Sequence, residues 1–331
     1  MSYARTRREF ITLLGGTAVA WPRAARAEKA VPVIGFLSAA SSGPFAHLAA
    51  AFRQGLQETG YIEGQNVMVY HWLGSDYNSL PTLMADLVRR QVALIATTGS
   101  GPTALAAKAA TMTIPIVFGV AEDPVQLGLV ASLSRPGGNA TGINFFFNEV
   151  LAKRLRLLHD LVPRAARIAI LVNPANTSSK EATLRRVQQA ATPVGLQIQM
   201  ILNATTIGEI DLAFAALARE RPDALFVAPD AFFTSRAVQF AILAARDRIA
   251  ATYAAREFVV AGGLMSYGTD LVDMSHQVGV YAGRILKGAK PAELPVMQST
   301  KFEFVLNLHT ARALGIEVPS GVLSIADEVV E

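Results

Sequence analysis

The stretch ATTGSGPTALAAK, residues 96–108, offers the clearest chemistry in this sequence. An apolar, strand-like segment runs into a loop with two glycines, and the loop opens onto an alanine-rich helix. The first N–H groups of a helix have no partner inside it, and the helix dipole attracts negative charge. A serine at the helix start can also cap it. The pattern therefore predicts a site for a small carboxylate, with the candidate residues Gly99, Ser100, Gly101 and Thr103.

Two other interpretations of the same loop stay open. Residues 99–104 fit the dinucleotide-binding pattern G-x-G-x-x-A, and the acidic pair Glu122-Asp123 follows about 20 residues later. That pattern normally belongs to the first strand–helix turn of a domain, whereas this loop follows the third predicted strand. No lysine lies within the loop, as a P-loop would need. The remaining alternative is a capped helix start that binds nothing.

More polar residues stand at the carboxyl ends of predicted strands or in a crossing strand, LMSY. Ligands of open α/β sheets bind outside such strand ends. Hydroxyls and an amide can face the carboxylate of a zwitterion, and an aspartate can face its ammonium group. Each residue, taken alone, is also compatible with an ordinary turn or cap. Phenylalanines at 145–147 and 232–233 could add aromatic walls. These candidate ligand-binding residues are Ser38, Thr98, Asp123, Asn173, Asp230, Ser266 and Tyr267.

The sequence contains little that could catalyse a reaction or hold a metal. It has no cysteine, which excludes thiolate nucleophiles, disulfides and cysteine metal sites. Its five histidines are scattered without metal-ligand spacing, and no G-x-S-x-G elbow is present. We therefore expect no catalytic residues, no metal and no cofactor, and a protein that binds its ligand without changing it.

The first 27 residues resemble an export signal. Paired arginines, Arg7 and Arg8, precede an apolar run, and an A-x-A cleavage pattern ends at Ala27. The arginine pair is typical of twin-arginine export, so we expect a periplasmic protein, or a tethered one if the leader stays uncleaved. Five of the 30 basic residues and one of the 26 acidic residues lie in this segment, so the rest of the chain has no net charge. A neutral body argues against a nucleic-acid partner.

The elements that would position the candidate residues alternate between strand and helix from residue 31 onward. Continuous apolar strands that alternate with helices predict parallel sheets covered on both faces. A first series runs through VPVIGFLSA, NVMVYHWLG, VALIA and IPIVFGV, and a helix is expected over PVQLGLVASL, residues 124–133. A second series of similar size begins at the amphipathic helix NEVLAKRLRLLHDLV. The prediction is an α/β fold with two doubly wound parallel-sheet lobes.

Three crossings between these lobes are expected, which would form a three-segment hinge. They lie near residues 142–144, 264–268 and 294–299. The lobes that result are residues 31–142 plus 265–296 for lobe 1, and residues 143–264 plus 297–331 for lobe 2.

Four long segments carry a resemblance to a known family: TIPIVFGVAEDPVQLGLVASLSRPGGNATG, AGGLMSYGTD, YAGRILKGAKPAELPV and FEFVLNLHTARALGIEVP. From about residue 33 to residue 319, the chain resembles the substrate-binding proteins of ABC importers, in particular a subgroup with tryptophan-binding lipoprotein-like members. The resemblance implies the type I periplasmic binding fold, a bilobed clamshell, and a small organic ligand between the lobes. Because the chain has no cysteine, we expect no lipid anchor of the kind that the lipoprotein members carry.

The function that we expect is that of an exported solute-binding protein, with an amino acid or an aromatic carboxylate as the favoured ligand. Its expected partners are that small molecule and the ABC permease subunits in the inner membrane, and we expect a monomer. Two alternatives stay open: an NAD-type dinucleotide-binding enzyme, and a periplasmic sensor domain that uses the same clamshell.

Overall fold

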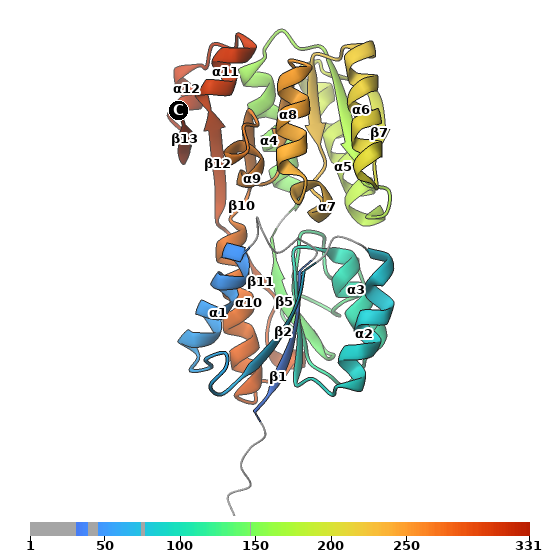
Figure 1. Cartoon of the computed structure of the whole chain (residues 1–331), viewed down its shortest axis with the longest axis vertical. Coiled ribbons are helices and arrows are strands. Elements are labelled where there is room, and N and C mark those ends of the chain that lie inside the picture. The colour runs from blue at the N-terminus through green and yellow to red at the C-terminus, as the bar shows by residue number, and fades with distance from the viewer. Residues whose placement is uncertain (1–30, 39–45, 74–76, 146) are drawn as a thin grey trace, which may run out of the picture. The chain divides into compact units, whose positions relative to one another are not determined.

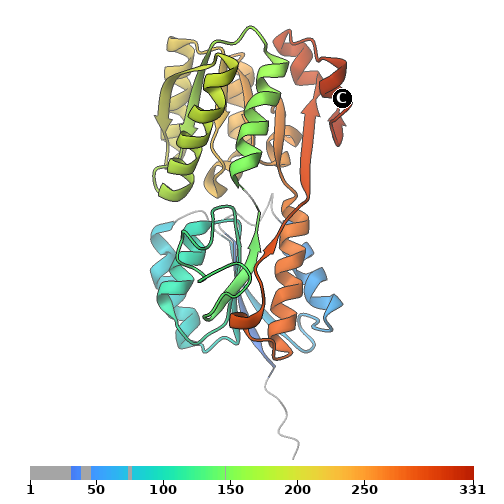
Figure 2. The same cartoon turned by 180° about the vertical axis from the view of Figure 1, so that it is seen from behind.

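Two separate sheets, each with helices on both faces, form the part of the chain that the computed structural model describes (Figures 1 and 2). The described residues are 31–38, 46–73, 77–145 and 147–331. The expected export signal, residues 1–27, lies outside them. Both sheets belong to one compact unit, Pro32–Glu331. The expected fold class, with two parallel-dominated α/β sheets, is confirmed.

The first sheet has six strands in the order β11-β5-β4-β3-β1-β2, and all of its neighbouring strands are parallel. The strands are β1 (Val33–Ser38), β2 (Met68–Leu73), β3 (Leu94–Thr98), β4 (Ile116–Val120), β5 (Ala140–Asn144) and β11 (Met297–Gln298). The longer helices around it are α1 (Ala46–Glu58), α2 (Leu80–Arg89), α3 (Gly101–Ala110) and α10 (Leu271–Leu286), and the short 3-10 helices are η1 (Tyr77–Ser79) and η3 (Pro291–Glu293).

The apolar residues of this sheet alternate between two cores, because successive side chains of a strand point to opposite faces. Ile34 and Phe36 pack with residues of α1 and α10, whereas Leu37 packs with residues of α2 and α3. Both faces are therefore buried, which explains why the strands read as continuous apolar runs.

Helix α10 packs very closely against α1. A Cβ at Gly55 would lie 2.0 Å from the His276 carbonyl oxygen, and a Cβ at Gly279 would lie 2.1 Å from that of Phe52. Only glycine permits two helix backbones to approach in this way. This contact fixes α10 against the first sheet, although the strand before it belongs to the second sheet.

The second sheet has seven strands in the order β13-β12-β10-β9-β8-β6-β7, and all pairs are parallel except β10 with β12. The strands are β6 (Arg167–Val172), β7 (Gln197–Asn203), β8 (Ala224–Val227), β9 (Ala250–Tyr253), β10 (Met265–Thr269), β12 (Phe302–Asn307) and β13 (Glu328–Val330). The helices are α4 (Phe147–Leu161), α5 (Thr177–Ala191), α6 (Ile207–Glu220), α7 (Ala231–Thr234), α8 (Ala237–Arg246), α9 (Arg256–Val260), α11 (Leu308–Leu314) and α12 (Ser320–Leu323), with the 3-10 helix η2 (Thr192–Val194).

The chain passes between the two sheets three times: from β5 into α4, from β10 into α10, and from β11 into β12. The lobe boundaries inferred from the sequence stay a prediction, but the sheet membership of three segments differs from them. Residues 143–144 and β11 pair within the first sheet, and β10 pairs with β9 and β12 of the second. The backbone hydrogen bonds of each segment continue the sheet that precedes it in the chain. Each crossing therefore comes a few residues later than the sequence predicted.

The helix expected over residues 124–133 is absent, and a single turn takes its place. The Asp123 side chain accepts hydrogen bonds from the N–H groups of Val125 and Gln126, and the Leu129 N–H closes the turn on the Pro124 carbonyl. Gly128 then adopts a left-handed backbone with φ of 72°, which ends helical geometry. Apolar residues whose spacing suggested a helix still reach the core from this turn, and Leu129 is one of them.

Candidate functional site

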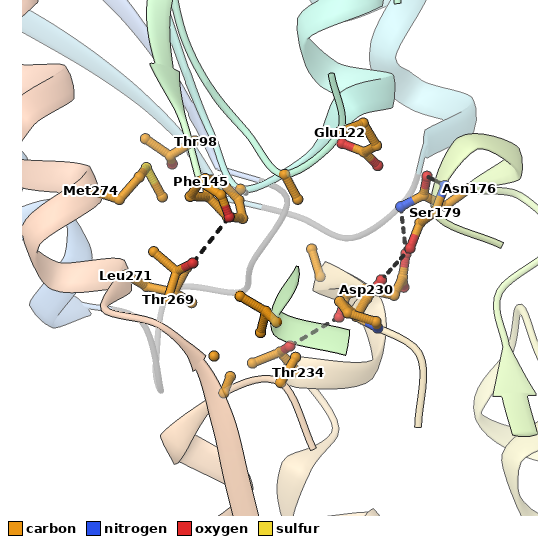
Figure 3. A pocket seen from close by; sticks show the side chains of 18 of the residues that line it. Thr98, Glu122, Phe145, Asn176, Ser179, Asp230, Thr234, Thr269, Leu271 and Met274 are labelled. Atoms are coloured by element: carbon orange, nitrogen blue, oxygen red, sulfur yellow. Dashed lines mark hydrogen bonds between the residues drawn. The ribbon is translucent and has the colours of Figure 1, made fainter. Parts of the chain in front are cut away.

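Residues of both sheets and their helices line one cavity at the carboxyl ends of the strands (Figure 3). Its volume is about 100 Å³, enough for several water molecules. Apolar side chains from both sides form much of its wall, among them Leu48, Phe145, Val150, Leu151, Leu271 and Met274. Its polar side chains are those of Thr98, Glu122, Arg154, Asn176, Ser179, Asp230, Thr234 and Thr269.

The glycine loop after β3 contributes Thr98 and Gly99 to the cavity wall. Gly99 has φ of 81°, a left-handed conformation that favours glycine and turns the chain sharply into α3. Ser100 caps α3 as the sequence predicts, accepting from the Thr103 N–H at 3.5 Å. Ser100 and Thr103 are buried and do not line the cavity.

Glu122, two residues after β4, occupies the space in front of the α3 N-terminus. A Cβ at Gly101 would lie 3.0 Å from Glu122 Oε2, so this carboxyl stands where the sequence predicted a ligand carboxylate. Glu122 is 9% exposed, and its Oε2 has no hydrogen-bond partner among the described residues. Burial raises the pKa of this carboxyl, and the charge of Asp230 raises it further. In the sequence, Glu122 stands out only as half of an acidic pair, although the strand-end rule could have identified it as a wall residue.

Asp230, after β8, is the centre of a hydrogen-bond network. Its carboxylate accepts from the side-chain amides of Asn173, at 2.9 Å, and Asn176, at 3.1 Å. It also caps α7 through the N–H groups of Phe232 and Phe233. Burial raises the pKa of Asp230, while these hydrogen bonds oppose the shift. Because a carboxylate accepts about four hydrogen bonds, the network leaves Asp230 little free capacity for a ligand.

A tyrosine of the first lobe reaches this network. Tyr77 Oη lies 3.4 Å from Asp230 Oδ2, and the Ser100 hydroxyl lies 3.4 Å from the same Tyr77 oxygen. Burial, followed by the charge of Asp230, holds the pKa of Tyr77 well above its usual value. Tyr77 therefore stays protonated at neutral pH and can donate across the two lobes.

Arg154, on α4, is a fully buried cation that the sequence analysis missed. Its Nη2 donates to the Val227 carbonyl at 2.8 Å, and its Cζ lies 4.0 Å from the centroid of the Phe226 ring. Burial lowers the pKa of its guanidinium to about 9, so the group is still charged at neutral pH. The helical spacing could have indicated that Arg154 is buried. It lies three residues after Leu151 and four before Leu158, on the apolar face of α4.

Most of the other candidates lie outside the cavity wall. Asp123 is exposed and caps its own turn, and Asn173 acts through Asp230. Ser266 is buried in β10, and the Tyr267 ring packs beside Phe302 and Phe304; Gly268 and Thr269 of the same strand line the cavity instead. Ser38 ends β1 beside Thr98 in register. The structure thus brings Thr98, Gly99 and Asp230 of the candidate set together around the cavity.

The phenylalanines of the two aromatic segments also differ in whether they reach the cavity. Phe145 lines the cavity, whereas Phe232 and Phe233 are buried in a core of the second lobe. Phe146 lies outside the described residues. Over the described ranges, no group of three or more histidine, aspartate or glutamate side chains could hold a metal ion, and no helix has both the length and the apolarity to cross a bilayer.

Comparison with known proteins decides the family. The model of the ABC transporter substrate binding protein family matches residues 32–330. The chain belongs to this family. The resemblance seen in the sequence and the type I periplasmic binding fold are thereby confirmed, and the family is one of substrate-binding proteins and not of enzymes.

One relative and two solved structures agree with this assignment. A tyrosine-binding protein of Clostridioides difficile (strain R20291) is 27% identical over 267 residues, which cover 80% of this chain and 76% of that protein. An ABC domain from Streptococcus pneumoniae, solved in complex with L-Trp, is 26% identical with a TM-score of 0.82, over 90% of this chain and 99% of that one. A ligand-free, open substrate-binding protein of Clostridium difficile is 25% identical with a TM-score of 0.64, over 91% of this chain and 99% of that one.

Proposed function

We propose that this substrate-binding protein captures an amino acid, with an aromatic amino acid favoured, and delivers it to the permease of an ABC importer. The observation that carries the proposal is the cavity, which is lined from both sheets at the strand ends where α/β proteins bind ligands. Two relatives described above bind tyrosine and tryptophan. The apolar wall around Phe145 and Met274 suits the side chain of such a ligand.

The mechanism is binding and closure without a chemical step. The cavity wall includes Phe145 and Thr269, which stand at two of the three crossings, and the Thr269 hydroxyl donates to the Phe145 carbonyl at 3.2 Å. A ligand that contacts both lobes favours whichever arrangement brings them together around it. Of the candidate ligand-binding residues, Thr98 and Gly99 would contact the ligand, and Asp230 would hold the cavity wall in place. The others stay predictions from the sequence: Ser38, Ser100, Gly101, Thr103, Asp123, Asn173, Ser266 and Tyr267.

Export is part of the same proposal. The paired arginines, apolar run and A-x-A pattern at the N-terminus support twin-arginine export to the periplasm. There the protein would meet permease subunits as a monomer.

Thermal unfolding of residues 28–331 with added compounds tests the proposal. We expect L-tryptophan or L-tyrosine to stabilise the protein, by about 2.7 kcal/mol at 100 times the dissociation constant. Chromatography should return the ligand unaltered. Stabilisation by NAD with no response to amino acids, or a chemically changed ligand, would show that the proposal is wrong.

A further inference from the structure

Arg154 has hydrogen-bonding capacity that the described residues do not use. A guanidinium carries five N–H donors. One nitrogen, Nη2, donates to Val227, whereas Nε and Nη1 have no partner among the described residues. The side chain is fully buried and lines the cavity. Buried polar groups are normally satisfied, so these free donors indicate a partner that arrives from outside the chain.

Arg154 also has no anionic partner among the described residues. In the portion of the chain that the structure describes, Arg154 forms no salt bridge, and burial is the sole influence on its pKa. The contrast with Arg256 is clear, because that arginine pairs with both Glu303 and Glu328. A buried cation without a counter-ion is strongly unfavourable, and an incoming anion would remove that penalty.

Glu122, on the first-sheet side of the cavity, disfavours a ligand carboxylate in front of α3. Glu122 faces the α3 N-terminus with a free Oε2, and in Figure 3 its carboxyl points into the cavity from the first-sheet side. A ligand carboxylate placed there would meet a group of the same kind, whereas an ammonium group would find an acceptor. Asp230 is already surrounded by donors. The cavity wall thus holds a cation with unused donors on α4 and, in front of α3, a carboxyl with one oxygen that has no partner among the described residues.

We propose that Arg154 binds the carboxylate of the ligand and that Glu122 receives its amino group. This inference rests on the proposed function and deepens it, because it names a zwitterionic α-amino acid and fixes its orientation. The orientation is the reverse of the one that the sequence suggested, in which the α3 N-terminus holds the carboxylate. A neutral sugar or a simple cation would leave Arg154 without a counter-ion.

Calorimetric titration of the mature protein with four probes tests the inference: L-tryptophan, L-tyrosine, tryptamine, which lacks the carboxylate, and indole-3-propionate, which lacks the amine. We expect Arg154→Met to weaken L-tryptophan at least about 30-fold, as loss of one partner of a buried charge pair does. Tryptamine affinity should stay within about threefold, because it has no carboxylate to lose. Glu122→Gln should weaken L-tryptophan but not indole-3-propionate.

The matched control is Arg156→Met, which removes an exposed arginine from the same helix and should leave every affinity unchanged. If Arg154→Met fails to fold, Arg154→Lys provides the comparison, because a lysine keeps the charge but loses the planar set of donors. Measurements on the wild-type protein alone also test the inference, because its affinity for L-tryptophan should exceed its affinity for tryptamine at least about 30-fold.

The outcomes separate this inference from the proposed function. If L-tryptophan or L-tyrosine binds wild type and Arg154→Met equally, the orientation is wrong and the amino-acid function stands. If the amino acids fail but indole-3-propionate binds wild type and not Arg154→Met, the amino-acid assignment falls and the carboxylate anchor stands. If no probe binds, both are overturned.

Discussion

The two sides of the cavity bury their carboxyl groups in different ways. On the second-sheet side, Asp230 accepts hydrogen bonds from two asparagine amides and from the start of α7. On the first-sheet side, Glu122 keeps an oxygen without a partner among the described residues. Burial raises the pKa of both groups. The difference is that one carboxylate is built into the structure, whereas the other is left available.

This contrast separates residues that hold the site together from residues that can meet a ligand. Asp230 joins the loops after β6 and β8, so its loss should act mainly on stability. Glu122 and Arg154 are incompletely satisfied, so their loss should act mainly on binding and on the response to pH. Three substitutions test this division, beginning with the largest expected effect.

Replacement of Asp230 by alanine should destabilise the protein most. The change leaves the side-chain amides of Asn173 and Asn176 and the first N–H groups of α7 without their acceptor. We expect the free energy of unfolding to fall by about 3 kcal/mol in urea titrations. Asp123→Ala is the control, because that exposed aspartate also caps a turn but joins no other segment; it should cost about 1 kcal/mol. Equal losses for the two variants would contradict the structural role of Asp230.

Replacement of Glu122 by glutamine should have a smaller effect on stability, and the size of that effect should depend on pH. The folded protein holds the Glu122 proton more tightly than the unfolded chain, because burial raises the folded pKa above the usual 4.5. Wild type therefore loses stability as the pH rises from that value through the raised pKa, and glutamine avoids the loss. We expect Glu122→Gln to match wild type in acid and to be more stable at neutral pH.

Urea titrations of both proteins between acid and neutral pH measure this difference. Asp230 is present in each, so the difference between the two curves reports the titration of Glu122 together with its electrostatic coupling to Asp230. Glu181→Gln, at an exposed position, should follow wild type throughout. If the Glu122→Gln protein is less stable than wild type at neutral pH, the Glu122 carboxylate makes a stabilising interaction that glutamine cannot make.

The fold could be predicted from the sequence because its signals are local and repeated. Apolar strands buried on both faces, helix caps such as Ser100, and turns such as the one at Gly99 each specify their own structure. The helix expected over residues 124–133 failed where two signals competed, because Asp123 and Gly128 favour a turn and the apolar spacing favours a helix. The sequence alone does not show which of the two signals prevails, because that depends on how the segment packs in the folded protein.

The site was predicted less completely because it depends on contacts between distant segments. Strand-end reasoning found Thr98 and Asp230, and the glycine-loop pattern found Gly99, but neither could show that Glu122 would fill the space before α3. It also could not show that Asp230 would be satisfied by asparagines more than 50 residues away in the chain. Arg154 was missed because an arginine in an amphipathic helix is usually solvated, and only its place among leucines sets it apart.

Tyr77 provides the smallest test, because it links the two sides directly. Both of its contacts, to Ser100 and to Asp230, are 3.4 Å long, beyond the usual range for hydroxyl hydrogen bonds. We expect Tyr77→Phe to lower the free energy of unfolding by about 0.5 kcal/mol or less and to weaken L-tryptophan less than about tenfold. Tyr281→Phe is the matched comparison, because its hydroxyl donates to the Pro295 carbonyl at 2.9 Å within the first lobe. That variant should cost about 1 kcal/mol and leave ligand affinity unchanged. If Tyr77→Phe instead proves the more costly of the two, the link between the lobes is stronger than its length indicates, and Asp230 would be a group shared by both sides of the cavity.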